Sequence, residues 1–235
     1  MPPGSTSRLK HQTELLRDMA QHVDGVLRTQ EELIDPQRPG QTLRRLLGLI
    51  LLFGMLYGGI MGCFAGRPLQ MLYSALKVPL LLLVTFGLSL PSFFVLNTLA
   101  GLRGDFAKVL RALAATQAGL TVILASLAPL TLLWYASFPD YESAVAYNTV
   151  TFGFASVVAQ LLLRRYYRPL IAQNLRHRLM IRIWIVLFAF TGIQMGWVLR
   201  PFVGFPGDET QFLRPESWGN AYLVVGEMFW DLIAR

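Results

Sequence analysis

Long apolar segments recur along the chain and alternate with short polar ones. An α-helix rises 1.5 Å per residue, so about 20 apolar residues cross the roughly 30 Å hydrocarbon layer of a bilayer. The last such segment is short and carries two acids, Glu227 and Asp231, so it either spans the bilayer or lies at its interface. The pattern predicts an all-α, polytopic bundle over residues 46–235, with about six transmembrane helices. The predicted spans are residues 46–64, 78–99, 113–136, 145–163, 183–199 and 218–234.

Residues 1–45 form a separate predicted element, in which apolar residues recur every three or four positions until Asp35 and Pro36. This spacing predicts an amphipathic helix. It could pair with a second helix, dock on the chain's own cytoplasmic loops, or lie on the bilayer surface. Its polar face mixes acids with basic residues, which favours contact with protein. The apolar positions are Leu9, Leu16, Met19, Val23, Val26 and Leu33.

Composition supports a membrane protein. Of the 235 residues, 54% are hydrophobic and 15% are charged, with a mean hydropathy of +0.45. A soluble domain carries about 25% charged residues, so one large soluble helical core is disfavoured. The lone Cys63 lies within an apolar segment, so no disulfide framework is expected within the chain.

The distribution of charge predicts the orientation. The net charge of +7 could suggest binding to nucleic acid, but basic residues also collect in the cytoplasmic loops of membrane proteins. Seven Lys and Arg precede the first span, three lie within 103–111 and six within 164–182. With alternating spans these regions share one side, which predicts cytoplasmic termini and no nucleic-acid partner. We expect a bacterial inner (plasma) membrane protein in contact with the lipid bilayer.

The segment RRYYRPLIAQNLRHR, residues 164–178, is the densest basic stretch. It could bind anionic lipid headgroups or the acidic face of a partner. Alternatively, its charge serves topology alone. The candidate contacts are Arg164, Arg165, Arg168 and Arg178.

Glycines repeat every four residues in the first span, at Gly54, Gly58, Gly62 and Gly66. Such a stripe lets a second helix approach closely in lipid. It could join copies of the chain into a homo-oligomer, bind other membrane subunits, or pack against a helix of the same chain.

Polar residues inside the spans suggest a possible proton or cation path. Glu227 and Asp231 are four residues apart and share a helix face, while Lys77 and Asn97 belong to the second span. Burying charge in hydrocarbon is costly, so such residues are candidates for function. A salt-bridged or interfacial helix would equally explain the two acids.

The stretch GIQMGWVLRPFVGFPG, residues 192–207, leaves the fifth span through Trp197, Arg200, Pro201 and Gly204. Tryptophan favours the headgroup level, and the prolines and glycines predict a stiff loop. The stretch is predicted to clasp the fifth and sixth spans, with a ligand or partner site as the alternative.

Signatures of enzymes are missing from the sequence. His11, His22 and His177 fall in predicted cytoplasmic segments, without metal-ligand spacing. No nucleophile elbow, phosphate-binding loop or zinc-protease motif occurs. We therefore expect no catalytic residues, no metal and no cofactor.

The stretch LKVPLLLLVTFGLSLPSFFVLNTLAG, like residues 192–207, resembles segments of uncharacterised bacterial multi-pass membrane proteins. Its Lys-x-Pro start and central proline are similar to Yip1-type membrane proteins. The resemblance implies a bacterial membrane scaffold. The chain lacks the DLYGP-type signature of that family, so no site residue carries over.

The leading functional hypothesis is a non-enzymatic subunit or scaffold of a membrane complex. It would assemble through the glycine stripe and the amphipathic N-terminal helix. The alternative is a small transporter or ion channel that uses the intramembrane polar residues.

Overall fold

The computed structural model describes residues 5–28, 39–207 and 209–213, and these residues form helices and connecting turns without strands. Two short 3-10 turns, Phe64–Gly66 and Arg103–Asp105, lie between the longer helices. The α-helices are α1 (Ser5–Leu27), α2 (Pro39–Met61), α3 (Pro68–Leu99), α4 (Phe106–Ser137), α5 (Tyr141–Gln173) and α6 (Arg176–Val198).

Five of these helices, α2 to α6, are long and apolar enough to cross a membrane. This confirms the all-α, polytopic class. The predicted sixth span, residues 218–234, lies outside the described residues, and with it Glu227 and Asp231.

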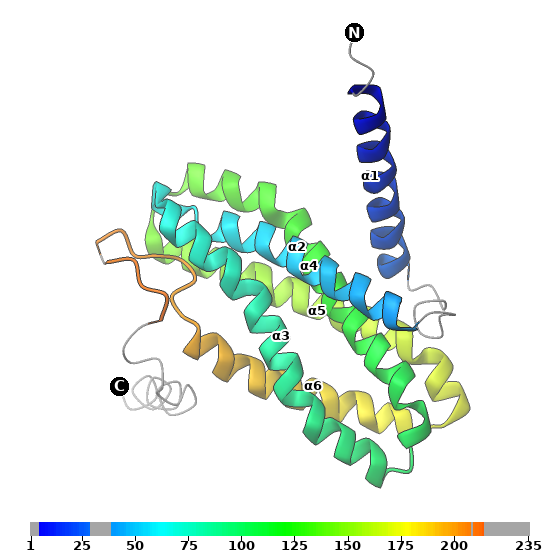
Figure 1. Cartoon of the computed structure of the whole chain (residues 1–235). Helices are drawn as coiled ribbons and strands as arrows, with labels where there is room; N and C mark the ends of the chain where they lie inside the picture. The colour runs from blue at the N-terminus through cyan, green and yellow to red at the C-terminus, as the bar shows by residue number, and fades with distance from the viewer. Residues whose placement is uncertain (1–4, 29–38, 208, 214–235) are drawn as a thin grey trace, which may run out of the picture.

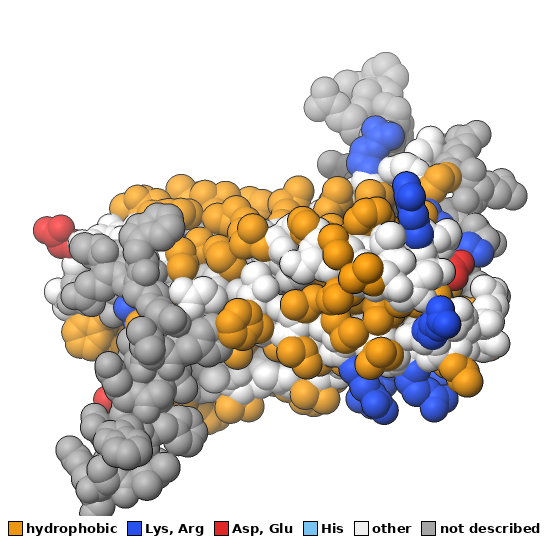
Figure 2. Space-filling view, turned by 90° about the horizontal axis from the view of Figure 1, so that it is seen from below, with side chains coloured by type: hydrophobic (Ala, Val, Ile, Leu, Met, Phe, Trp, Pro, Cys, Tyr) orange, Lys and Arg blue, Asp and Glu red, His pale blue; other side chains and the backbone are white. Residues whose placement is uncertain are grey.

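The helices α2 to α6 run up and down side by side, as Figure 1 shows. One end of the bundle carries the start of α2 and the turns α3–α4 and α5–α6; we call it the basic end. The other, the loop end, carries the turns α2–α3 and α4–α5 and the segment 199–213. Figure 2 shows Lys and Arg gathered at the basic end, with a broad apolar band between the ends. The band includes exposed Leu133, Val150, Val157, Val186 and Phe190, as expected for a surface that faces lipid.

Helix α3 starts earlier than its apolar segment predicts, at Pro68 rather than at residue 78. Proline is well suited to the first turn of a helix, where its missing N–H is not needed. The added turns carry Gln70 and Ser74, which the apolar pattern left outside the span, and Lys77, which it placed at the edge of the span. All three are buried.

The glycine stripe of α2 packs against α3 of the same chain. A Cβ atom on Gly58 would lie 2.3 Å from the Ser74 carbonyl oxygen, and one on Gly54 would lie 3.2 Å from Pro79 Cβ. One on Gly62 would lie 2.7 Å from the Gln70 carbonyl oxygen. The stripe therefore provides a close contact within the chain, and α3 covers the face that the oligomer hypothesis required.

The fourth glycine of the series has another role. Gly66 ends a 3-10 turn with a positive φ of 65°, and no atom lies within 4 Å of a Cβ placed there. Its backbone conformation, which L side chains rarely adopt, accounts for the glycine.

Helix α1 docks on the bundle by its C-terminal turn. Val26 is buried, and its carbonyl accepts a 2.7 Å hydrogen bond from the Tyr166 hydroxyl of α5. The preceding turns carry exposed residues such as Thr13 and Gln21, and α1 projects away from the bundle in Figure 1. Three placements were predicted for this amphipathic helix. Its C-terminal turn adopts one of them, contact with its own chain.

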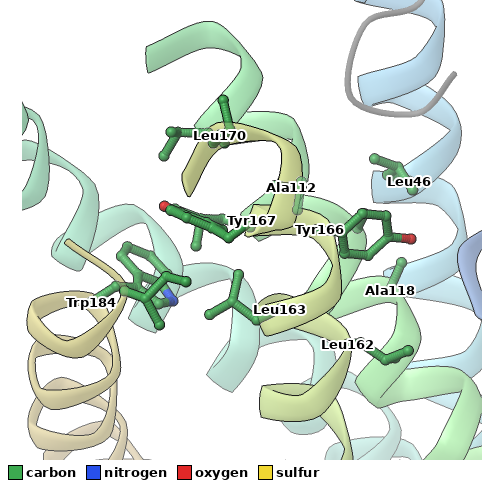
Figure 3. Close-up of a cluster of buried hydrophobic side chains, with 14 of the residues drawn as sticks. Leu46, Ala112, Ala118, Leu162, Leu163, Tyr166, Tyr167, Leu170 and Trp184 are labelled. Atoms are coloured by element: carbon green, nitrogen blue, oxygen red, sulfur yellow. The ribbon is translucent and has the colours of Figure 1, made fainter. Parts of the chain in front are cut away.

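The half of the core near the basic end contains four buried aromatic residues, Phe93, Tyr166, Tyr167 and Trp184. Figure 3 shows Tyr166 and Tyr167 pointing to opposite sides of α5, with Trp184 of α6 on the side of Tyr167. The ring of Trp184 packs edge-on against Phe93 of α3, with 5.0 Å between the ring centroids. This packing ties α6 to α3 at the basic end.

Candidate functional site: a polar face on α3 and a groove beside α6

Helix α3 carries buried polar residues along its whole length, which we call its polar face. Spacings of three and four place Gln70, Ser74 and Lys77 together on one side, and Thr85 with Ser89, while the two steps of eight positions turn the row around the helix. Each is at most 2% exposed. Polar groups at membrane depth need partners from the protein. The residues of this face are Gln70, Ser74, Lys77, Thr85, Ser89 and Asn97.

The loop-end half of this face holds the non-helical segment that follows α6. Lys77 Nζ donates a 2.6 Å hydrogen bond to the Pro201 carbonyl oxygen. Gln70 Nε2 donates to the Phe202 carbonyl oxygen at 3.0 Å, and the Ser74 hydroxyl donates to the same oxygen. Buried carbonyls outside a helix need such donors, because they have no intrahelical partner. Three side chains of α3 thereby hold the chain after α6 inside the bundle.

Two of the predicted clasp residues, Pro201 and Gly204, lie against this face. A Cβ on Gly204 would lie 3.0 Å from the Gln70 side chain, so the loop fits closely there. The other two contact each other: the guanidinium carbon of Arg200 lies 3.4 Å from the centroid of the Trp197 ring, a cation–π contact. The predicted clasp between the fifth and sixth spans stays a prediction, because residues 218–234 lie outside the described residues.

Only two of the predicted ion-path residues, Lys77 and Asn97, lie in the described part of the chain. Lys77 and Asn97 belong to opposite halves of α3, about 30 Å apart at 1.5 Å per residue. Asn97 Nδ2 donates to the Phe93 carbonyl of its own helix at 3.0 Å. Glu227 and Asp231 lie outside the described residues. The described residues of that set form no single site.

Two adjoining cavities lie between α3, α5 and α6. The loop-side chamber, about 510 Å³, is lined by Asn148 and Gly196 and by Arg200 to Val203. The central chamber, about 390 Å³, also reaches α4. Both are lined by Leu81, Phe152 and Ile193, so we treat them as one groove.

The polar wall of the loop-side chamber is internally hydrogen-bonded. Asn148 Oδ1 accepts from the Tyr57 hydroxyl at 3.0 Å, and its Nδ2 donates to the Tyr135 hydroxyl at 2.7 Å. The Tyr135 hydroxyl in turn donates to the Met61 carbonyl at 3.0 Å. This network joins α2, α4 and α5 and fixes the amide of Asn148.

On the walls of the central chamber, three polar atoms have no hydrogen-bond partner within the described residues. Thr85 Oγ1, Gln117 Oε1 and Gln160 Oε1 are buried and make no hydrogen bond within the described part of the chain. By contrast, the Thr116 hydroxyl in the same chamber donates to the Ala112 carbonyl at 2.8 Å. Buried polar atoms nearly always have partners, so three orphans on one cavity need an explanation.

The basic candidates lie outside the groove. Arg164, Arg165, Arg168 and Arg178 are exposed near the basic end, where α5 ends and α6 begins. Nearby, the buried His177 Nε2 lies 3.2 Å from Asp105 Oδ2 and joins the turns α3–α4 and α5–α6. Within the residues described, no three His, Cys, Asp or Glu side chains are placed to hold a metal ion.

Sequence reasoning missed Gln70, Ser74 and Thr85, although a signal was present. Polar residues recur at helical spacing from residue 70 to residue 97 within an apolar helix, and this periodicity marks a face buried against protein. Lys77 was placed at the edge of a span, whereas it lies inside α3 and is completely buried.

Comparison with known proteins identifies no relative of this chain. The resemblance to Yip1-type proteins therefore stays a prediction. The chain matches no model of a known protein family, no curated protein and no solved structure.

Proposed function

We propose that this chain is a non-enzymatic, multi-pass membrane protein that binds a lipid-like amphiphile in the groove between α3, α5 and α6, as a carrier or transporter. The observation that carries the proposal is the pair of adjoining chambers with apolar walls and a few polar groups. Cavities of about 300–1,000 Å³ with this kind of lining are typical of small-molecule sites.

The rim of the groove reaches the lipid-facing surface. Val157 of α5 and Ile193 of α6 line it and are 62% and 54% exposed. An amphiphile dissolved in the bilayer therefore has an apolar route into the groove between these helices. The non-helical segment after α6 lines the loop-side chamber, and irregular backbone at membrane depth is typical of transporter binding sites.

A second candidate is the membrane-complex subunit expected from the sequence. The projecting part of α1 favours it, because its exposed turns are available to another membrane subunit or a second copy. The glycine stripe gives this candidate no support, since α3 covers it. Cross-linking from a cysteine at Thr13, in a chain with Cys63→Ala, tests it: a cross-linked dimer or hetero-complex is expected, and monomer alone would contradict it.

Filling the loop-side chamber tests the groove directly. Gly196 lines this chamber, and no atom lies within 4 Å of a Cβ placed there, so Gly196→Phe adds a ring without a backbone clash. Gly153 on α5 has the same open space but does not line the groove, so Gly153→Phe is the matched control.

The probe is a dodecanol that carries a diazirine on its chain, presented to the purified protein in lipid nanodiscs. We expect saturable labelling of the wild-type protein and of Gly153→Phe, with labelling of Gly196→Phe reduced about tenfold, equivalent to 1.4 kcal/mol. Labelling that is equal in all three proteins, or that excess dodecanol does not compete, would contradict the proposal.

A further inference from the structure

The central chamber gathers orphan polar atoms from three helices. Thr85 comes from α3, Gln117 from α4 and Gln160 from α5. Thr85 and Gln117 are 1% and 3% exposed, and the hydroxyl of Thr85 and the amide oxygens of both glutamines are without hydrogen-bond partners in the described residues. An unpaired buried polar atom destabilises the folded protein. A ligand that supplied the missing partners would recover part of that cost.

The missing partner is a hydrogen-bond donor. Two of the three orphans are amide oxygens, which only accept hydrogen bonds, and the third is a hydroxyl, which can do either. The donor also has to be uncharged. None of the described residues that line the chamber is titratable, so a charged group there would lack a counter-charge at membrane depth.

Apart from the hydroxyl residues Thr116 and Ser156, the rest of the chamber lining is apolar. Leu82, Leu120, Val157, Ile185 and Phe188 belong to it. Water bonded to the polar atoms would leave this apolar part of the chamber unfilled, because apolar cavities stay dry. An alkyl chain suits it well, and it can continue past Phe152 and Ile193 into the bilayer.

We infer that the central chamber binds the neutral hydroxyl headgroup of a long-chain alcohol. The alcohol hydroxyl donates a hydrogen bond to the amide oxygen of Gln117 or Gln160 and accepts one from the Thr85 hydroxyl. The alkyl chain of the alcohol lies along the apolar wall. This inference rests on the proposed function of the groove and adds the class of ligand.

Three probes of similar length test the inference in nanodiscs, each competing with the photoreactive dodecanol at equal mole fraction in the bilayer. Dodecanol carries a hydrogen-bond donor, whereas dodecyl methyl ether and methyl laurate carry only acceptors. We expect dodecanol to compete about tenfold better than the ether and the ester on the wild-type protein. This ratio requires no variant, so it remains decisive if a variant fails to fold.

Variants then locate the hydrogen bonds. Thr85→Val and Gln117→Leu each remove one orphan group. Each is expected to weaken competition by dodecanol about three- to tenfold, as the loss of one hydrogen bond would, and to leave competition by the ether unchanged. Thr116→Val is the matched control, because the Thr116 hydroxyl lines the same chamber but is already bonded to Ala112. It is expected to leave the ratio of alcohol to ether intact.

The two proposals fail differently. Equal competition by all three probes, or preference for the ester, would overturn the donor inference, and the groove would stand if Gly196→Phe still blocked labelling. Saturable labelling that Gly196→Phe does not reduce would overturn the groove itself, and the headgroup assignment with it.

Discussion

At the scale of single residues, Lys77 is a charged side chain that is buried in the described bundle and depends on its partners. Its side chain is completely buried in a helix that is long and apolar enough to cross a membrane. Its ammonium donates to the Pro201 carbonyl and lies 5.1 Å from the centroid of the Phe212 ring. A buried charge is tolerated only with such partners. Lys77 therefore links α3 to the segment that closes the loop-side chamber.

Replacing Lys77 should release that segment. Lys77→Met keeps a long, flexible side chain but removes the 2.6 Å hydrogen bond to the Pro201 carbonyl, which then keeps only the longer one, 3.4 Å, from Gln70 Nε2. We expect a loss of about 1–3 kcal/mol in stability, seen as a lower unfolding midpoint in detergent, and faster hydrogen exchange in residues 199–213. Lys108→Met, on α4 close to the basic end, serves as the control. An unchanged midpoint and unchanged exchange would show that Lys77 does not hold the loop.

At the scale of elements, the packing of α2 on α3 depends on glycine. The Ser74 carbonyl lies so close to Gly58 that no room is left for a Cβ, and the two backbones are in direct contact. In lipid, where apolar side chains gain little from leaving the solvent, close backbone approach is a main source of helix association. The polar face of α3 and the glycine face of α2 belong to one interface.

Two neighbouring glycines allow a matched test of this contact. Gly58→Ala places a methyl group 2.3 Å from the Ser74 carbonyl oxygen, whereas one at Gly59 meets only Ala75 Cβ at 3.8 Å. We expect Gly58→Ala to cost about 1–3 kcal/mol by overpacking, and Gly59→Ala to be neutral or slightly stabilising because alanine favours helix. The measurement is the unfolding midpoint at two protein concentrations. A loss for Gly58→Ala that appears only at the higher concentration would point back to an oligomer contact.

The sequence predicts the helices better than their contacts. Apolar length locates all five described spans, because crossing a bilayer imposes a minimum length on any helix. It misplaces the start of α3, because Gln70, Ser74 and Lys77 read as polar and their partners lie more than 120 positions further along the chain. The groove could not be predicted from the sequence. Gln117 and Gln160 are polar residues within predicted spans, but whether they meet a partner or a cavity depends on how α4 and α5 are packed.

At the scale of the whole molecule, charge separates the two ends of the bundle. Arg and Lys gather where α1, the α3–α4 turn and the α5–α6 turn lie, as Figure 2 shows. The positive-inside rule then predicts that the basic end faces the cytoplasm and that the loop end, with segment 199–213, faces the opposite side. The groove would lie nearer the non-cytoplasmic surface.

Cysteine labelling in intact bacterial cells checks this orientation. In a chain with Cys63→Ala, Pro139→Cys places a thiol in the exposed α4–α5 turn, and Gly104→Cys places one in the exposed α3–α4 turn. We expect a membrane-impermeant maleimide to label residue 139 in intact cells and residue 104 only after lysis. The reverse pattern would invert the predicted topology, and labelling of both in intact cells would rule out a fixed orientation.

The central claim is that a lipid-like amphiphile occupies the groove beside α6. The most direct measurement is to locate, residue by residue from fragment-ion mass spectra, where the photoreactive dodecanol attaches to the wild-type protein in nanodiscs. The account predicts adducts at Leu81, Phe152 and Ile193 themselves, which are lost when excess dodecanol is added. Adducts spread instead over lipid-facing positions such as Leu133, Val150 and Val186, and insensitive to competitor, would contradict it.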